Sequence, residues 1–425
     1  MYSIKNLCRK QNLITKRKHI LFTNPSDILL SIMTKVVLFF QTATLRSKAW
    51  RDKIAGVYQY ASKAKWQVQM VQSGASADEI NYMLDVWKPI GCIIDRSSSD
   101  LRNPTNLFRG IPVVLMDQNP RTARHGYSNV NHDSTATATL AAHELLQTNV
   151  ETYSYVPHRI DTHWNRQRQR ALSAAVRKAG KRFIDWGTTP FAGNLTTAQQ
   201  DRLIAERLGQ FPVPFGLLCA NDQIAQRVMH MAGEVGLSIP RDMTIIGIDN
   251  DELICENTRP TLSSVLPDFQ RGGYIAAELL DRAIRDPTAS AVTASYGPLQ
   301  LVRRQSTRRF TFQDPLVNRA MEIISEKGFD PSFHTEDLLD DLRCSRSLLE
   351  MRFRKEIGHS IREEVQRQRF EKALTLLRNP HQAITPVPTL CGYASDAFFK
   401  RLFKRKTGLT MREWRKQNLI TETHA

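Results

Sequence analysis

The stretch SRSLLEMRFRKEIG, residues 345–358, decides the fold of the last quarter of the chain. Ser345 can cap a helix through its side-chain oxygen. Leu349, Phe353 and Ile357 then recur at i, i+4 and i+8, which predicts a helix with one buried stripe. Because a shorter acidic helix is predicted directly before it, the two together indicate a helix-turn-helix pattern.

A second stretch, GYASDAFFKRLFKRKTG at 392–408, repeats this design. Ser395 is its expected cap, and Phe399 and Phe403 belong to its buried stripe. Between the two patterns, residues 363–378 carry apolar side chains at i, i+3, i+4 and i+7, followed by a proline. We therefore predict one connecting helix between two helix-turn-helix units.

Polar and mostly basic side chains are left on the outward faces of both second helices. A major groove about 12 Å wide admits one helix, so two such helices on one connector are typical of a double contact with DNA. A small helical bundle without DNA contact is the alternative. The side chains expected to point outward are Arg346, Ser347, Glu350 and Arg354 on the first helix, and Asp396, Lys400, Arg401, Lys404 and Arg405 on the second.

These two stretches, their connector and the sequence CGYASDAFFKRLFKRKTGLTMREWRK at 391–416 resemble the DNA-binding domain of AraC/XylS-type transcription regulators. The resemblance implies which side chains face bases: Ser347, Glu350 and Met351 in one groove, and Asp396, Ala397, Lys400 and Arg401 in the next. The chain departs from the family at Pro386 and Pro388. Proline is tolerated only in a first turn, so the helix there is expected to be short.

Composition agrees with a nucleic-acid partner. The chain has 425 residues, which predicts two or three domains, and its 59 Lys and Arg exceed its 42 Asp and Glu to give a net charge of +17. A membrane surface is the competing partner for a basic chain, but no lipidation motif or long basic amphipathic helix supports it. Six cysteines without a Cys-X-X-Cys pair are typical of a reduced, cytoplasmic protein.

Strands and helices alternate through the first three quarters of the chain. The apolar run VVLFF at 36–40 begins the first series, and the helix after it places Ile54, Val57 and Tyr58 on one face. A second series begins near Val150. Such alternation predicts two successive parallel sheets covered on both faces, with a cleft between the lobes. Ligands of these sheets gather at the carboxyl ends of the strands.

Catalytic and metal-binding motifs are not apparent. The sequence has no Gly-X-Gly-X-X-Gly, no phosphate loop and no Gly-X-Ser-X-Gly elbow. His125, His132 and His143 do not have the spacing of a zinc site. We therefore expect no enzyme activity, no cofactor and no metal. A sugar-processing enzyme with an appended helical domain remains the alternative from another class.

Three segments, at 219–225, 240–252 and 260–265, resemble the effector lobes of LacI-type regulators, which share the periplasmic sugar-binding-protein fold. Amide and carboxylate groups at strand ends suit neutral polyols, and an aromatic face suits the C–H surface of a sugar ring. The candidate ligand contacts are Asp249, Asn221, Asp222, Arg168, Trp164, Asp133 and Arg51. The alternatives are helix capping for Asp249 and Asp133, and packing or surface ion pairing for Arg168 and Trp164. One of Asn221 and Asp222 is expected to cap the next helix.

The order of the two modules, joined through the stretch LVRRQSTRR at 301–309, resembles that of bacterial xylose-operon activators. The resemblance implies a cytoplasmic, sugar-responsive transcription activator that binds operator DNA as a homodimer and acts on RNA polymerase. D-xylose is the favoured effector, and another sugar or metabolite is the alternative. A DNA binder whose lobes no longer bind ligand is a third hypothesis.

The predicted fold is an α/β two-lobed periplasmic-binding-protein-like domain with parallel sheets, followed by an all-α domain with two helix-turn-helix motifs. The predicted boundaries are a poorly ordered N-terminal extension at 1–34, the effector domain at 35–309, a linker at 310–320, the DNA-binding domain at 321–418 and a tail at 419–425.

Overall fold

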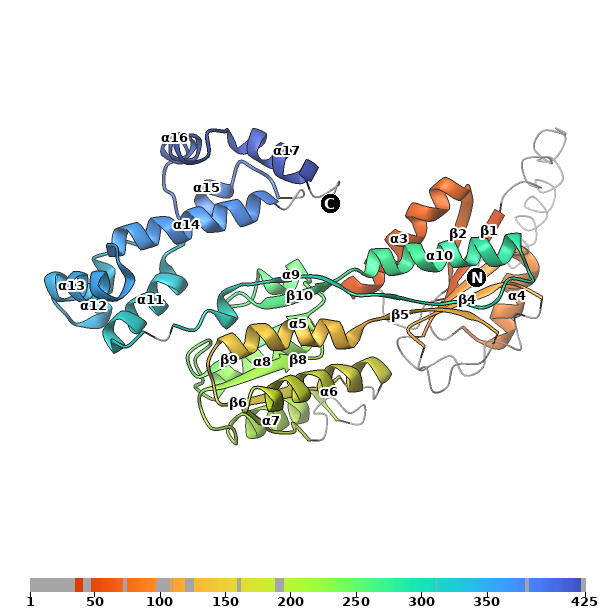
Figure 1. Cartoon of the computed structure of the whole chain (residues 1–425), viewed down its shortest axis with the longest axis horizontal. Helices are drawn as coiled ribbons and strands as arrows, with labels where there is room; N and C mark the ends of the chain where they lie inside the picture. Colours follow the sequence, from red (N-terminus) through yellow and green to blue (C-terminus); the bar gives the residue numbers. More distant parts are fainter. Residues whose placement is uncertain are drawn as a thin grey trace, which may run out of the picture.

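The computed structural model places two α/β lobes side by side and a helical domain beyond them (Figure 1). It describes residues 35–40, 47–71, 75–96, 108, 110–118, 126–158, 162–187, 195–310, 312–378 and 382–421. The predicted extension at 1–34, His125 and most of the predicted tail lie outside these ranges. Within them, no helix combines the length and the apolar character that a membrane crossing needs.

The first lobe is built on a parallel sheet with the strand order β11-β5-β4-β3-β1-β2. Its central strands are buried along their whole length, as expected for a sheet with helices on both faces. Its elements are β1 (Lys35–Phe40), α3 (Lys48–Ala64), β2 (Trp66–Val71), α4 (Ala77–Trp87), β3 (Gly91–Asp95), β4 (Val113–Met116), β5 (Ser128–His132), α10 (Phe269–Arg285) and β11 (Thr293–Tyr296).

Helix α3 packs along α10, and this contact corrects one prediction. The two helices approach so closely that a Cβ on Gly273 would lie 1.8 Å from the backbone oxygen of Lys53. Ile54 and Val57 are buried as predicted, whereas Tyr58 is 46% exposed. Because α10 covers the face of α3 that carries Lys53 and Val57, Tyr58 points away from the lobe core.

The second lobe carries a sheet in the order β12-β10-β9-β8-β6-β7, in which only the pairing of β10 with β12 is antiparallel among the described strands. Its elements are α5 (Ser134–Gln147), β6 (Thr152–Val156), α6 (His163–Lys178), β7 (Arg182–Phe183), α7 (Thr197–Leu208), β8 (Phe215–Cys219), α8 (Asp222–Glu234), β9 (Met243–Ile248), α9 (Glu252–Cys255), β10 (Ser263–Pro267), β12 (Pro298–Val302) and the 3₁₀ turn η3 (Gln305–Thr307).

The chain passes between the lobes at three places: after β5, after β10 and after β11. Backbone hydrogen bonds tie these crossings together, from Asp133 N to Tyr296 O at 2.7 Å and from Asp268 N to Gly297 O at 3.0 Å. Three adjacent crossings form a hinge, because they let the lobes move relative to one another while keeping them in register. Asp133 lies at this hinge.

The C-terminal domain is all helical, and its two units lie at opposite ends of α14 (Figure 1). Ser345 and Ser395 cap α13 and α16 by accepting hydrogen bonds from Leu348 N and Phe398 N, which confirms both predicted helix starts. The elements are α11 (Pro315–Lys327), α12 (Asp337–Leu342), α13 (Arg346–Ile357), α14 (Ile361–Arg378), α15 (Val387–Leu390), α16 (Asp396–Thr407) and α17 (Met411–Thr421).

Two further predictions concern this domain. Helix α15 is a single turn with Pro386 at its N-cap and Pro388 inside its first turn, so the short helix expected there is confirmed. Helix α11 begins at Pro315 behind the cap Asp314, within the segment 310–320 that we predicted as linker. We therefore propose that the C-terminal domain starts at Asp314.

Candidate functional site

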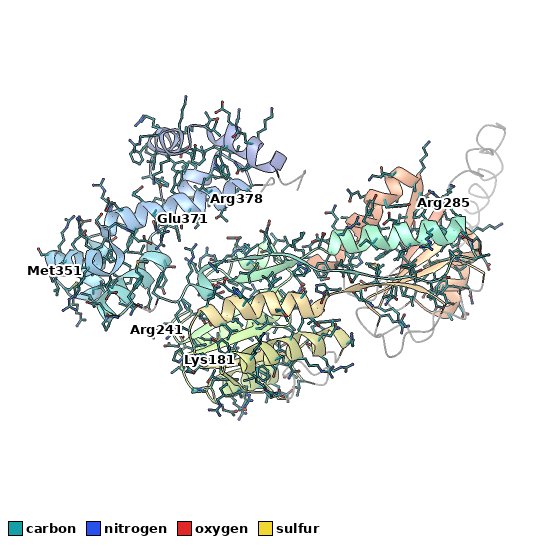
Figure 2. All side chains as sticks on the ribbon, viewed as in Figure 1. Lys181, Arg241, Arg285, Met351, Glu371 and Arg378 are labelled. Carbon is teal, nitrogen blue, oxygen red and sulfur yellow. The ribbon has the colours of Figure 1, made fainter. Side chains whose placement is uncertain are left out.

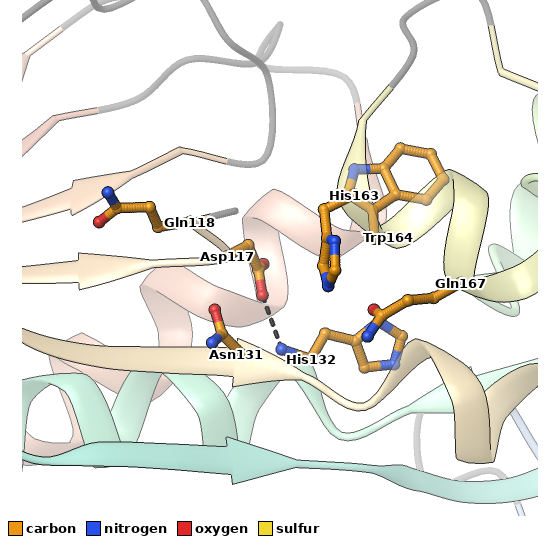
Figure 3. Close-up of a pocket in the computed structure, with 7 residues that line it drawn as sticks. All are labelled: Asp117, Gln118, Asn131, His132, His163, Trp164 and Gln167. Carbon is orange, nitrogen blue, oxygen red and sulfur yellow. Dashed lines mark hydrogen bonds between the residues drawn. The ribbon is translucent and has the colours of Figure 1, made fainter. Parts of the chain in front are cut away.

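A polar pocket lies between the two lobes at the hinge (Figure 3). It is a small cavity of about 60 Å³. Strands β4 and β5 of the first lobe supply one wall, and helix α6 of the second lobe supplies the other. The lining residues are Asp117, Gln118, Asn131 and His132 from the first lobe, and His163, Trp164 and Gln167 from the second.

The chemistry of this lining suits a small neutral polyol. Trp164 offers an aromatic face, while Gln118, Asn131 and Gln167 offer amides that can both donate and accept. The Oδ1 atom of Asn131 is buried and accepts no hydrogen bond from the described residues. Because buried polar atoms are nearly always paired, this oxygen is a candidate acceptor for a ligand hydroxyl.

The pocket floor is a buried ion-pair network in the first lobe. The Lys53 ammonium lies 3.1 Å from Asp95 and 2.5 Å from Asp117, and both pairs are shielded from solvent. Burial alone lowers the pKa of Lys53, but the Asp117 and Asp95 carboxylates outweigh it and raise that pKa above its usual range. Asp117 also accepts hydrogen bonds from His132 N and the Tyr296 hydroxyl. The network thus fixes the carboxyl ends of β3, β4 and β5.

His132 joins this floor to the hinge. Its ring packs on Tyr296 at 5.2 Å, and its two nitrogens contact the hydroxyls of Ser134 and Thr137. Burial and the nearby Arg168 cation lower the pKa of His132 to about 3. The imidazole is therefore neutral at physiological pH, and it can accept a hydrogen bond from the opposite lobe.

Arg168 reaches across the hinge from α6, and its predicted contact with the ligand stays a prediction. One guanidinium nitrogen donates to Ala220 O at 2.5 Å, and the other lies 3.3 Å from His132 Nδ1 in the first lobe. The guanidinium also stacks on Trp164 at 4.6 Å. Arg168 is 4% exposed, so these contacts are made away from water, where they are strongest. Arg168 therefore couples the Trp164 wall of the pocket to both lobes.

Asp249 ends β9 in an unusual backbone conformation, with φ at 113°. Asp117 ends β4 with φ at 52° and thus mirrors it in the first lobe. Positive φ is unfavourable for residues with a Cβ, and outside helix ends such residues cluster at ligand sites. The Asp249 carboxylate accepts no hydrogen bond from the described part of the chain, and burial raises its pKa to about 7. Its role as a ligand contact stays a prediction.

Three of the predicted contacts have structural partners instead. Asn221 caps α8, and Asp133 is an exposed cap of α5. Asp222 is buried, and its carboxylate accepts from Ser264 Oγ at 2.6 Å and from Asp251 N at 2.7 Å. Since both oxygens of Asp222 already hold strand ends together, we interpret Asp222 as structural. The capping alternatives therefore describe Asn221 and Asp133 in this structure.

Arg51 lies at the edge of the cleft rather than in the pocket. Its guanidinium is 3.5 Å from Asp251 of the second lobe, and its side chain is 45% exposed. This pair joins α3 of one lobe to the turn that begins α9 of the other. Because the pair is long and solvent-exposed, its contribution to stability is small. It nevertheless depends on the distance between the lobes.

Several pocket residues were not predicted, and the sequence carried a signal for most of them. Asp95 ends the strand GCIID, and Asp117 and Gln118 follow VVLM. The strand-end rule that selected Asp249 applies equally to these positions. Lys53 had no such signal, since a lysine on a helix is ordinarily a surface residue. His132 was considered only as a metal ligand.

Most of the side chains predicted to point outward from the helical domain are exposed, whereas Glu350 and Asp396 are half-buried. On α13, Ser347 and Met351 are exposed, Arg346 pairs with Glu336, and Arg354 pairs with Glu350. Met351 projects from the far end of the molecule (Figure 2). On α16, Ala397, Lys400, Arg401, Lys404 and Arg405 are exposed, and the last four line one groove together with the start of α17.

These features define a class of protein: a two-lobed domain with a hinge pocket, followed by two helix-turn-helix units. Family comparison agrees with both parts. Residues 142–307 match the periplasmic binding protein-like domain, and residues 338–417 match a helix-turn-helix domain. The chain is thus a DNA-binding transcription regulator that joins a periplasmic-binding-protein-like domain to an AraC-type helix-turn-helix domain.

Two relatives that match most of the chain are xylose operon regulatory proteins. The chain is 26% identical to the xylose operon regulatory protein of Escherichia coli K12 over 376 residues, which cover 87% of this chain and 94% of that protein. The protein of the same name from Haemophilus influenzae is 25% identical over 376 residues, covering 86% and 94%.

Solved structures share this architecture. The xylose-binding transcription activator xylR superposes with a TM-score of 0.71 at 23% identity, covering 91% of this chain and 99% of that one. The effector part alone matches a LacI family regulator from Enterococcus faecium with bound ribose, with a TM-score of 0.53 at 20% identity over 65% of this chain and all of that one. The predicted fold class is confirmed.

Proposed function

We propose that a pentose, with D-xylose as the first candidate, binds in the hinge pocket and controls DNA binding by the helical domain. The observation that carries this proposal is the pocket itself: Trp164 and Gln167 from one lobe face Asn131 and Gln118 from the other, all polar or aromatic. The xylose assignment is supported by the named function of the two xylose operon regulatory proteins above.

A sugar that touches both walls favours lobe closure, because the closed state allows more contacts with the ligand. Arg168 and the pair of Arg51 with Asp251 are the direct contacts that such a motion changes. Asp251 also caps α9 and donates its backbone N–H to Asp222. A change at the cleft therefore reaches the segment after β9.

That segment contacts the basic stretch 303–309, which leads to the helical domain. Arg303 and Arg304 are paired with Glu144 and Glu256 of the second lobe. Because both arginines already have carboxylate partners, we do not assign them to a DNA phosphate. The amide of Gln305 accepts from Thr261 N at 2.9 Å and donates to Ser325 O on α11. This amide is a direct hydrogen-bonded link between the effector domain and the first helix-turn-helix unit.

We further propose that two chains pair on adjacent operator half-sites, and that the bound dimer activates transcription by contacting RNA polymerase in the cytoplasm. Lobe closure would then change how far apart the two helical domains lie. A regulator that responds to another sugar is the second candidate, since pentoses and hexoses are both neutral polyols and the polar lining of the pocket suits either class. The relatives reported above are transcription regulators, and we propose no catalytic step.

The test is a calorimetric titration of the purified chain with D-xylose, D-ribose, L-arabinose and D-glucose. We expect saturable binding, tightest for D-xylose, and a change in DNA affinity at saturating sugar. Equal weak binding of all four sugars would contradict the xylose assignment. A second sugar that binds more tightly than D-xylose would replace it and leave the regulatory role intact.

Gln305→Ala tests whether the hydrogen-bonded link through Gln305 transmits the sugar signal to the helical domain. We expect sugar affinity and basal DNA affinity to stay within about twofold of wild type, while the sugar-dependent change in DNA affinity falls from about tenfold to about twofold, because loss of the link removes about 1 kcal/mol of a coupling free energy of about 1.4 kcal/mol. Gln300→Ala, at an exposed position of β12, is the matched control. An unchanged sugar response in Gln305→Ala excludes this link from the route.

A further inference from the structure

Helix α14 belongs to two separate hydrophobic cores. Near its start, Ile361 and Val365 pack with α11, α12 and α13 in the first helix-turn-helix unit. Near its end, Ala373 and Leu377 pack with α15, α16 and α17 in the second unit. Figure 1 shows the two groups of helices at opposite ends of α14. Apolar packing therefore holds each unit to the connector, and it does not by itself hold the units to each other.

Arg369 lies between these two cores, in the middle of α14. It is 8% exposed, although no carboxylate of a described residue pairs with it. Its Nε donates to Gly328 O at 2.6 Å, and one terminal nitrogen donates to Asp330 O at 3.0 Å and to Phe333 O at 3.3 Å. All three acceptors belong to the loop between α11 and α12. One buried guanidinium thus fixes the main chain of the first unit.

The same guanidinium contacts the second unit. It lies 5.9 Å from the ring of Tyr393, in the turn between α15 and α16. Gly392 in that turn has φ at 84°, and a Cβ there would lie 2.8 Å from Arg369 Nε and 2.9 Å from the backbone carbon of Phe329. The turns of both units therefore meet at Arg369. On its other side, the Lys372 ammonium lies 4.1 Å from the ring of Phe329.

The packing of the second unit on α14 fixes it to the connector, and the Arg369 contact also links it to the first unit. The first helix of the second unit, α15, is a single turn. A long connector alone would permit bending and twisting between the units, since helices curve readily over several turns. The buried guanidinium of Arg369 resists such motion, because moving the loop between α11 and α12 would leave three main-chain carbonyl groups without their donor.

We propose that Arg369, with Phe329 and Gly392, is a positioning residue that fixes the spacing between the reading helices α13 and α16. The protein would thereby select DNA by the distance between two boxes, the short runs of base pairs that α13 and α16 each contact. This inference rests on DNA binding by both units. One inserted base pair rotates the second box by about 36° and shifts it by about 3.4 Å. A rigid pair of units cannot follow such a shift, whereas a loosely joined pair can.

The experiment starts with a duplex that the full-length wild-type chain selects from a random-sequence library. Affinity is then measured for this duplex, for versions with one or two base pairs inserted between the boxes, and for a duplex that keeps only one box. The variants are Arg369→Lys and Phe329→Ala. The first keeps the positive charge but loses the planar guanidinium that donates to three carbonyl groups, and the second leaves Arg369 in place. Arg362→Ala, an exposed arginine on the same helix, is the matched control.

For wild type and Arg362→Ala, we expect one inserted base pair to weaken binding at least about tenfold, the size of one mismatched base pair. For Arg369→Lys and Phe329→Ala, we expect a loss below about threefold, with single-box affinity kept. Failure of wild type to select any duplex refutes DNA binding instead.

Three results overturn the inference. The first is a wild-type chain that binds DNA and tolerates the insertions. The second is an insertion penalty of wild-type size in both variants. The third is an equal loss of affinity on every duplex, including the single-box duplex, because that marks general destabilisation and no role in spacing.

Discussion

Lys53→Met is the sharpest test of the pocket floor, because it removes the cation that pairs with two buried carboxylates, Asp95 and Asp117. The side chains of Lys53, Asp95 and Asp117 are 3%, 1% and 8% exposed. Removing one partner of a buried ion pair costs about 3–5 kcal/mol, since the remaining charge is left unpaired away from water. We expect a loss of this size in the free energy of unfolding, measured by urea denaturation at pH 7.

Lys48→Met is the matched control. Lys48 makes a partly exposed pair with Asp52 four residues along the same helix α3, and helix pairs of this spacing contribute about 0.3–0.5 kcal/mol. Adding Asp117→Asn to Lys53→Met should restore at least about 1 kcal/mol, because one orphaned charge is then removed. A loss for Lys53→Met no larger than for Lys48→Met would refute the buried network.

The pH dependence adds a second check. Burial raises the pKa of Asp117, but Lys53 and His132 outweigh burial and bring it below the usual 3.8. The stabilisation from ionised Asp117 is therefore present above pH 3.8 and is lost as the pH falls below that value. Without Lys53, burial dominates and the carboxylates take up protons more readily. The difference between Lys53→Met and wild type should thus shrink as the pH is lowered from 7 towards 4.

Three further predictions concern single residues of the pocket and the DNA-binding face. Trp164→Ala should weaken sugar binding about tenfold in calorimetry, because it removes the aromatic wall and the stacking on Arg168. Lys404→Ala should weaken binding to all DNA sequences alike and lower the salt slope of the affinity by about 1, as loss of one phosphate contact does. Because burial raises the pKa of Asp249 from 3.8 to about 7, wild-type stability should fall by up to about 1.4 kcal/mol per pH unit as the pH rises from about 4 to about 7 and level off above 7, and Asp249→Asn should reduce this slope in urea denaturation.

Local features of the helical domain could be predicted from the sequence, because they depend on neighbours a few residues apart. Ser345 and Ser395 cap helices through bonds to residues three positions ahead. The one-turn length of α15 follows from Pro386 and Pro388, since proline fixes φ and lacks an N–H. These effects act within one helical turn and need no knowledge of tertiary structure.

The pocket could be predicted only in part. Trp164 and Arg168 were identified because a single helix carries both towards the cleft. The pocket floor joins Lys53 to Asp95 and Asp117, which lie 42 and 64 positions later in the chain. Such contacts depend on the order of strands in the sheet, which periodicity does not reveal. Arg369 has the same character, because its three acceptors lie 36 to 41 positions earlier in the chain.

The central claim is that sugar in the hinge pocket controls DNA binding by the helical domain. Its most direct test is the DNA affinity of the full-length chain on a selected duplex, measured by fluorescence anisotropy with and without saturating D-xylose. We predict a saturable change of about tenfold, a coupling free energy of about 1.4 kcal/mol. An identical affinity in both conditions, with calorimetry showing that the sugar is bound, would contradict the claim.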